Sequence, residues 1–137
     1  MTQTRLFTPF ELFGIEVNEG WWPLIKPIYN RIQELNKSGA NIEIDQIKEK
    51  WGELCIYVSS APEEIYNMIR DAEQRSIHIC EDCGKPAESV ISTHSWIYTL
   101  CPECLKKRGI KVDTTVKEFN RRMKEADSQI DNQYIKK

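Results

Sequence analysis

Four cysteines carry the clearest chemical signal in this chain. They form two Cys-x-x-Cys pairs, Cys80 with Cys83 and Cys101 with Cys104, and seventeen residues separate the pairs. Each pair lets two thiolates reach one ion from a tight turn, and two such turns complete the tetrahedral sulfur set that suits Zn²⁺. We therefore predict that these four residues bind a structural zinc ion. A catalytic zinc is not expected, because four thiolates leave no position for water.

Two other interpretations of the cysteine pairs are disulfides and a redox-active Cys-x-x-Cys. The chain opens without a signal-peptide pattern, so we expect a reducing cytoplasm, where disulfides are rare. A thioredoxin-like site needs one pair inside a βαβ pattern, and this chain has two matched pairs. The metal site is therefore the preferred interpretation.

Two histidines and a fifth cysteine lie near this signal. His78 precedes Cys80 by two residues and His94 falls in the segment between the pairs, so either could replace a cysteine ligand. A histidine in a turn is more often solvated, and we keep the four cysteines. Cys55 lies in a β-prone run, where we interpret it as a small buried hydrophobic residue rather than a nucleophile.

The hydrophobic pattern predicts an α+β fold in three parts. Residues 1–78 form a domain with a β-hairpin between two helices, residues 79–109 form a zinc ribbon or knuckle, and residues 110–137 form a C-terminal helix with a frayed tail. The expected helices cover residues 23–36, 60–75 and 114–131, and the expected strands cover 41–50, 53–59, 89–92 and 96–100.

Several local details of these elements can be checked. The aromatic residues in 1–18 indicate a packed segment, and Ile47 breaks a strand alternation, which predicts a bulge nearby. Ser60 with Glu63, and Thr115 with Glu118, have the spacing of helix N-caps. Residues 110–113 are expected to be a connector. The last helix carries an apolar stripe, interpreted as core or a self-association surface: Val116, Phe119, Met123, Ala126 and Ile130.

Charge is distributed unevenly along the chain. Residues 1–100 carry 9 basic and 15 acidic side chains, whereas residues 101–137 carry 10 and 6. The acidic part argues against a broad nucleic-acid surface, but the basic part leaves room for one contact patch. Lys117, Arg121 and Lys124 share one face of the predicted last helix, and a solvated helix face is the alternative interpretation.

The chain lacks the patterns of common enzymes. It has no glycine-rich phosphate loop and no Gly-x-Ser-x-Gly, and the His-x-Glu and Pro-Cys-x-x-Cys signature of zinc deaminases is absent because Leu100 precedes Cys101. The apolar runs are too short to cross a bilayer. We therefore predict a non-enzymatic, cytoplasmic protein.

A series of short motifs resembles a family of small zinc-binding proteins encoded by phages and prophages, and the likeness spans roughly residues 10–105. Within that class the chain is similar to zinc-containing type II-A anti-CRISPR proteins. Where the family pattern has a second glycine and an arginine, this chain has Glu53 and Cys55, so a role of that arginine does not transfer. The motifs are Phe13-Gly14-Ile15-Glu16, Gly20-Trp21, Leu24-Ile25, the run 46–54, Ala72-Glu73-x-x-Ser76 and Cys80-Glu-x-Cys83-Gly84-Lys85-Pro86.

The resemblance implies a host protein as the partner, namely an RNA-guided type II CRISPR nuclease that is blocked before it loads DNA. Acidic side chains would then compete for the basic nucleic-acid channel of the nuclease, whereas the alternative is that they only keep the protein soluble. A second function hypothesis is a small DNA- or RNA-binding regulator that uses the basic C-terminal helix. A monomer or weak dimer is expected. The acids are Glu43, Asp45, Glu49, Glu63, Glu64, Asp71 and Glu73.

Overall fold

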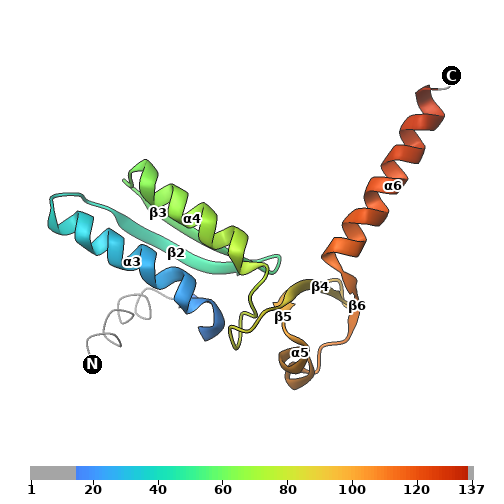
Figure 1. Ribbon diagram of the computed structural model, residues 1–137, viewed down its shortest axis with the longest axis horizontal. Coiled ribbons are helices and arrows are strands. Elements are labelled where there is room, and N and C mark those ends of the chain that lie inside the picture. Colours follow the sequence, from blue (N-terminus) through green and yellow to red (C-terminus); the bar gives the residue numbers. More distant parts are fainter. Residues whose placement is uncertain (1–14, 136–137) are drawn as a thin grey trace.

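The computed structural model describes residues 15–135 of the chain, and it has the predicted α+β architecture (Figure 1). The packing expected for residues 1–18 therefore lies mostly outside the described residues. Of that segment, the structure shows Val17 buried in the core.

A three-stranded sheet and two helices form the N-terminal part. The short strand β1 (Ile15–Glu16) pairs in parallel with β2 (Glu43–Lys50), which pairs in antiparallel with β3 (Glu53–Ser59). A 3₁₀ turn, η1 (Glu19–Trp21), leads into α3 (Trp22–Lys37), and α4 (Glu63–Ser76) follows the hairpin. Helices α3 and α4 lie side by side against the hairpin (Figure 1).

The helices and the sheet share one apolar core because their spacings bring apolar side chains to facing surfaces. Ile25 and Ile32 lie on one face of α3, and Leu54 alternates toward the same side of β3 as its neighbour Ile56. These residues pack with Ile65 at the start of α4, and all of them are buried. The predicted bulge is confirmed, since the register of β2 and β3 shifts between Ile44 and Gln46.

The hairpin turn has an unusual sequence for its geometry. Lys50 pairs with Glu53, so Trp51 and Gly52 are the two turn residues, with φ of 57° and 78°. Positive φ at both positions defines the type I′ turn that fits the twist of a hairpin. Glycine adopts this conformation without strain, but a tryptophan rarely does. The turn also leaves the Trp51 indole 65% exposed.

The predicted capping box at the start of α4 is wrong. The helix begins at Glu63 with Pro62 as its N-cap, and no side chain caps it. Ser60 lies in the left-handed region, with φ of 61°, two residues before the N-cap, so its position does not match that of a capping hydroxyl. Glu63 and Glu64 in the first turn face the positive end of the helix dipole instead.

The C-terminal part is a second three-stranded sheet with one short and one long helix. Its elements are β4 (Glu88–Ser92), β5 (Ile97–Leu100), α5 (Pro102–Arg108), β6 (Val112–Thr115) and α6 (Val116–Ile135). The hairpin of β4 and β5 was predicted, with its turn at residues 93–95. The left-handed Gly109, with φ of 70°, ends α5.

Two expectations for the C-terminal part are wrong. The second half of the supposed connector at 110–113 belongs to β6, which pairs with β4 because that strand still offers a free edge of backbone donors and acceptors. The expected frayed tail is helical up to Ile135. The N-cap prediction at Thr115 agrees with the structure, since its Oγ1 accepts a hydrogen bond of 3.0 Å from the Glu118 N–H.

Ser76 ties the end of α4 to β3 from inside the core. Its hydroxyl donates to the Glu73 carbonyl and accepts from the Leu54 N–H at 3.0 Å, and the residue is fully buried. We expect Ser76→Ala to lower the free energy of unfolding by about 1–3 kcal/mol, because the Leu54 N–H would be buried without a partner. Urea unfolding measures the change. Ser38→Ala, at the C-cap of α3, is the control, and an equal loss in both variants would contradict the prediction.

Candidate metal centre

The four predicted cysteine ligands come together at one point. Their sulfur atoms all lie within 4.8 Å of one another, and the Sγ atoms of Cys83 and Cys101 are 3.6 Å apart. A tetrahedral zinc ion with Zn–S bonds of about 2.3 Å holds its sulfurs about 3.8 Å apart. A disulfide requires about 2.0 Å. The sulfur spacing therefore fits ligands around an ion and does not fit a disulfide between Cys83 and Cys101.

The first pair lies in the tight turn between α4 and β4. The Cys80 N–H donates to the Lys85 carbonyl at 2.7 Å, and the Gly84 N–H donates to the Cys80 carbonyl at 2.9 Å. Gly84 has a φ of 84°, which explains why glycine follows the pair directly. The Lys85 N–H points to the Cys83 sulfur. This turn aims both thiols of the pair inward.

The second pair lies at the start of α5. Cys101 is the N-cap residue, and Cys104 follows on the first turn of the helix. The Cys104 N–H donates to the Cys101 sulfur, and together with the neighbouring thiols it lowers the pKa of Cys101 to about 7. Burial and the same neighbours raise the pKa of Cys104 to about 12. A bound cation would relieve this conflict, because it stabilises every thiolate at once.

Exposure differs among the ligands. Cys80, Cys101 and Cys104 are buried, whereas Cys83 is exposed. An ion at this point would be enclosed on three sides and supported by packing with Leu100 and Leu105. With all four positions filled by sulfur, the centre has a structural rather than a catalytic arrangement.

The turn η1 docks directly on the first cysteine pair, a contact that the sequence did not reveal. The Gly20 N–H donates to the Glu81 carbonyl at 2.7 Å. A Cβ atom at Gly20 would overlap the Cys80 carbonyl oxygen and lie 2.5 Å from that of Glu81. Glycine is therefore required here for close approach of two backbones. Trp21, fully buried, donates its Nε1–H to the Ile79 carbonyl at 2.7 Å.

A polar cluster extends this contact at the surface. Asp82 accepts a hydrogen bond from the Asn18 amide at 2.7 Å and is held by the Arg108 guanidinium, whose Nε lies 2.8 Å away. The pKa of Asp82 is lowered: its burial opposes ionisation, but the hydrogen bonds from Arg108 and Asn18 outweigh it. The cluster joins the segment before α3, the first cysteine turn and the end of α5.

The two histidines lie outside the sulfur cluster. His94 is exposed in the turn between β4 and β5, and His78 lines a cleft beside α4. Among residues 15–135, the cluster that could hold a metal contains the four cysteines only. Cys55 is half-buried on β3, and burial, with Glu73 and Glu53 nearby, raises the pKa of its thiol. A protonated thiol is a poor nucleophile, which agrees with the structural interpretation of Cys55.

Four of the predicted partner-binding acids lie on α4, and three of them are paired with an arginine. An exposed ion pair contributes little to stability, but it lowers the negative charge that a partner would meet. The pairs are Glu63 with Arg70 (3.0 Å), Glu64 with Arg31 (2.9 Å) and Asp71 with Arg75 (3.4 Å).

Most of the remaining predicted acids also bond within the chain. Glu49 accepts from the Gly52 N–H at 2.7 Å, Asp45 from the Ser59 hydroxyl at 2.7 Å, and Glu73 from the Ile56 N–H at 3.0 Å. Six of the seven acids are therefore engaged in internal bonds, and Glu43 is the exception among the described contacts. The structure does not bring the seven acids together as one unpaired acidic surface.

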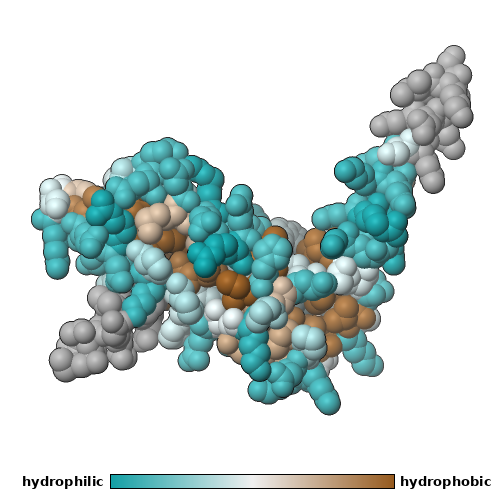
Figure 2. Space-filling model, viewed as in Figure 1, coloured by the Kyte–Doolittle hydropathy of each residue, from teal (hydrophilic) through white to brown (hydrophobic). Residues whose placement is uncertain are grey.

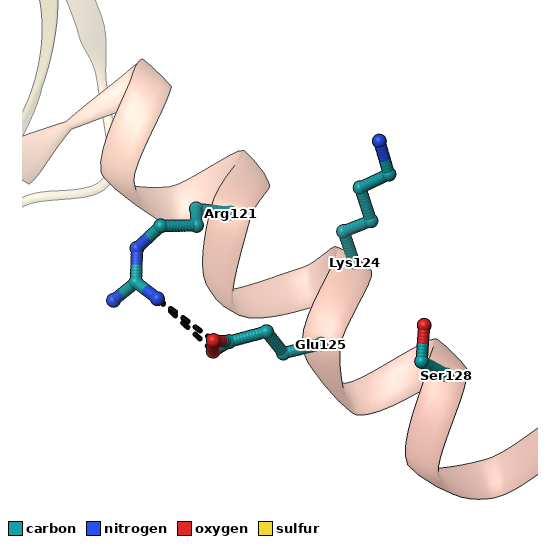
Figure 3. Close-up of a pocket in the computed structure, with 4 residues that line it drawn as sticks. All are labelled: Arg121, Lys124, Glu125 and Ser128. Atoms are coloured by element: carbon teal, nitrogen blue, oxygen red, sulfur yellow. Dashed lines mark hydrogen bonds and ion pairs between the residues drawn. The ribbon is translucent and has the colours of Figure 1, made fainter.

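The predicted basic face of the last helix is also interrupted. Arg121 pairs with Glu125 at 2.8 Å (Figure 3). It also pairs with Glu118, whose pKa it lowers to about 2. The Lys124 side chain extends away from this pair (Figure 3). Lys117 lines the same cleft as His78. The three bases therefore do not act as one unpaired cationic stripe.

A cleft of about 680 Å³ lies where the two halves of the chain meet. Trp51 from the turn between β2 and β3, Val116 from the first turn of α6 and Ile97 of β5 all line it. Its remaining lining residues are Glu53, Ile77, His78, Glu88, Ser89, Lys117 and Asn120. In the sequence, the sign of this cleft is Trp51. A tryptophan at a turn position is not needed for packing of the core.

The site and fold define a small α+β protein with a four-cysteine metal centre. No family model, curated protein or solved structure matches the chain. Within the described part of the chain, no helix combines the length and apolar character needed to cross a membrane.

Proposed function

We propose that this chain is a non-enzymatic binding protein held together by a structural zinc ion. The observation that carries the proposal is the set of four sulfurs within 4.8 Å, supplied by two turns. Thiolate ligands in a tetrahedral set favour zinc over the oxygen-seeking ions Mg²⁺ and Ca²⁺. A saturated ligand set holds surfaces in place rather than activating water.

The partner in this proposal is a host defence protein, with an RNA-guided type II nuclease as the specific target. The motif resemblance to phage and prophage proteins supports this choice of target. Blocking DNA loading requires that the inhibitor occupy a surface that nucleic acid would otherwise contact. Most of the predicted acids already bond within the chain. Competition by acidic side chains for the nucleic-acid channel therefore supports the proposal less than the exposed aromatic surface does.

Trp51 and the adjoining cleft are the binding surface that the geometry supports best. An indole 65% exposed beside a cleft is the type of residue that dominates protein interfaces once it is desolvated. The turn holds Trp51 rigidly, since Gly52 is fixed by the Glu49 carboxylate and its carbonyl accepts from the Thr99 hydroxyl at 2.5 Å. A rigid anchor loses little entropy on binding.

We expect Trp51→Asn to weaken capture of the host nuclease about 30-fold, the effect of removing one interface anchor. Asparagine tolerates positive φ, and Asn-Gly suits a type I′ turn, so the hairpin is preserved. Binding is measured by pull-down from a host lysate and by titration of the captured protein. Trp96→Ala is the matched control, because Trp96 is also 65% exposed but does not line the cleft.

An electrophoretic shift with random DNA over a salt series separates this proposal from the nucleic-acid alternative. Binding through Lys117 and Lys124 would be steeply salt-dependent and would be lost when both lysines are replaced by glutamine. No shift, together with capture of the nuclease, supports the inhibitor. A shift without capture contradicts it.

A further inference from the structure

Helix α6 leaves the body of the molecule as an arm. Its packing is confined to its first turns, which contact β4 and β6, and the rest projects away (Figure 1). Every residue from 119 to 128 is exposed. Figure 2 shows the arm as mostly hydrophilic in this view, with apolar surface gathered at its base. In proteins most of the stability of a helix comes from packing an apolar face, so a helix of 20 residues with so little packing calls for a partner.

The arm carries an apolar face that nothing in the described chain covers. Phe119 is 43% exposed and Met123 is 49% exposed. They belong to a stripe spaced alternately by three and four residues, which is the a and d pattern of a heptad repeat. Val116 and Met123 occupy a positions, Phe119 and Ala126 occupy d positions, and the sequence continues with Ile130 at the next a position. A stripe restricted to a and d positions is narrower than the face of a core-packed helix and has the width of a coiled-coil seam.

The flanking positions identify the partner. In the same repeat, Arg122 occupies a g position and Asp127 the following e position, five residues further on. In a parallel pair of identical helices, each g residue lies beside the e residue of the next heptad on the other helix. Arg122 of each copy would then meet Asp127 of the other, giving two ion pairs. The other g and e combination within α6, Gln129 with Tyr134, sets no like charges together.

An antiparallel pair does not give this complementarity in any register. There, g positions face only g positions, and the g residues of α6 are Arg122 and Gln129, neither of them acidic. The e positions face only e positions, and Asn120, Asp127 and Tyr134 include no base. Charge complementarity therefore selects the parallel arrangement.

We propose that α6 pairs with α6 of a second copy of this chain as a parallel two-stranded coiled coil, with Phe119 and Met123 at its centre. The outward b, c and f positions agree with this arrangement, because they hold charged residues that bond along the same helix. On that outer face Arg121 bonds to Glu125 (Figure 3) and to Glu118. The Nε atom of Arg122 lies 3.1 Å from the Glu118 carboxylate, which Arg121 also contacts. Asp127 has no ion pair with a described residue. Asp127 is therefore available for the partner helix, and Glu118 keeps its pair with Arg121 when Arg122 turns toward that helix.

Sedimentation of the full zinc-loaded chain over a concentration series tests the association. The wild type should shift from 16.1 kDa toward twice that mass. Met123→Glu should remain monomeric, because it places two carboxylates in the apolar seam. Ser128→Glu adds the same charge at an f position and should leave the dimer intact. Circular dichroism and metal content show that each variant is folded. A wild type that stays monomeric at all concentrations, or dimers unaffected by Met123→Glu, would overturn the proposal.

A charge exchange tests the pairing and its direction. Arg122→Glu alone should raise the dissociation constant about tenfold, since it sets a second carboxylate against Asp127 twice per dimer. The double variant Arg122→Glu with Asp127→Arg should restore wild-type affinity. Lys124→Glu changes the net charge equally at an outer position and should have little effect. Failure of the double variant to recover would contradict the parallel pairing.

A disulfide cross-link between the two copies of α6 tests the register of the coiled coil. In a Cys55→Ser background, Ala126→Cys places a thiol at a d position, where the two copies of a parallel coiled coil adjoin. Mild oxidation should yield a covalent dimer, and the Cys55→Ser protein alone should not. If the chain is monomeric and Met123→Glu instead abolishes capture of a host protein, the face belongs to that partner and the proposal fails.

Discussion

Replacing Cys101 by serine is expected to abolish metal binding and to unfold the segment from Cys80 to Gly109. Cys101 is buried, its sulfur lies 3.6 Å from that of Cys83, and it joins the end of β5 to the start of α5. Structural zinc contributes on the order of 10 kcal/mol to the folding of small metal modules. That exceeds the stabilisation that the apolar cluster around the cysteines can supply. Besides the cysteines, this cluster has only Val90, Leu100 and Leu105 as buried apolar side chains.

Metal content by mass spectrometry and a thermal scan measure this effect on the purified chain. Cys55→Ser is the matched control, because this thiol lies on β3 outside the sulfur cluster. A chelator should reproduce the loss in the wild type, and so should acid, since protons compete with the ion for the thiolates. Stoichiometric zinc in the Cys101→Ser variant with an unchanged melting temperature would contradict the proposed centre.

Gly20→Ala is expected to have the second largest effect, although the residue lies about sixty positions before the metal site. The added methyl group would overlap the Cys80 carbonyl and crowd that of Glu81, and neither backbone can move without distorting the first cysteine turn. We expect the free energy of unfolding to fall by about 3 kcal/mol or more, above the usual range for overpacking, because the clash is with backbone rather than a flexible side chain. The zinc affinity should fall with it.

Urea unfolding and competition with a zinc chelator measure the two quantities on the same samples. Gly109→Ala is the comparison variant, since a methyl group there meets nothing within 4 Å and costs only about 1–2 kcal/mol for its left-handed backbone. A Gly20→Ala protein with wild-type stability and zinc affinity would show that the turn and the cysteine pair separate freely.

The elements whose signals are local were predictable. The ligand set follows from the spacing of four cysteines, and the two hairpins follow from alternating residues that flank short turns at residues 51–52 and 93–95. The helices follow from apolar spacing, which places Ile25 and Ile32 on one face of α3. Such signals depend on chain geometry within a few residues, so they can be read without knowing the rest of the fold.

The contacts that join distant segments were not predictable. Strand β6 forms because β4 offers an open edge, and nothing in residues 110–113 alone indicates that edge. The pairing of six predicted acids with arginines, hydroxyls and backbone N–H groups changed the interpretation of their role, because partners such as Arg31 are remote in sequence.

The sequence alone determined that four thiols would converge at one point within an α+β chain, because ligand spacing and hydrophobic periodicity are properties of short segments. Only the tertiary structure decided that Gly20 and Trp21 support the metal turn, that Trp51 borders a cleft, and that α6 is an unpaired arm. These features arise from packing between residues far apart in the chain, and packing depends on shape and on excluded volume, which no local pattern encodes.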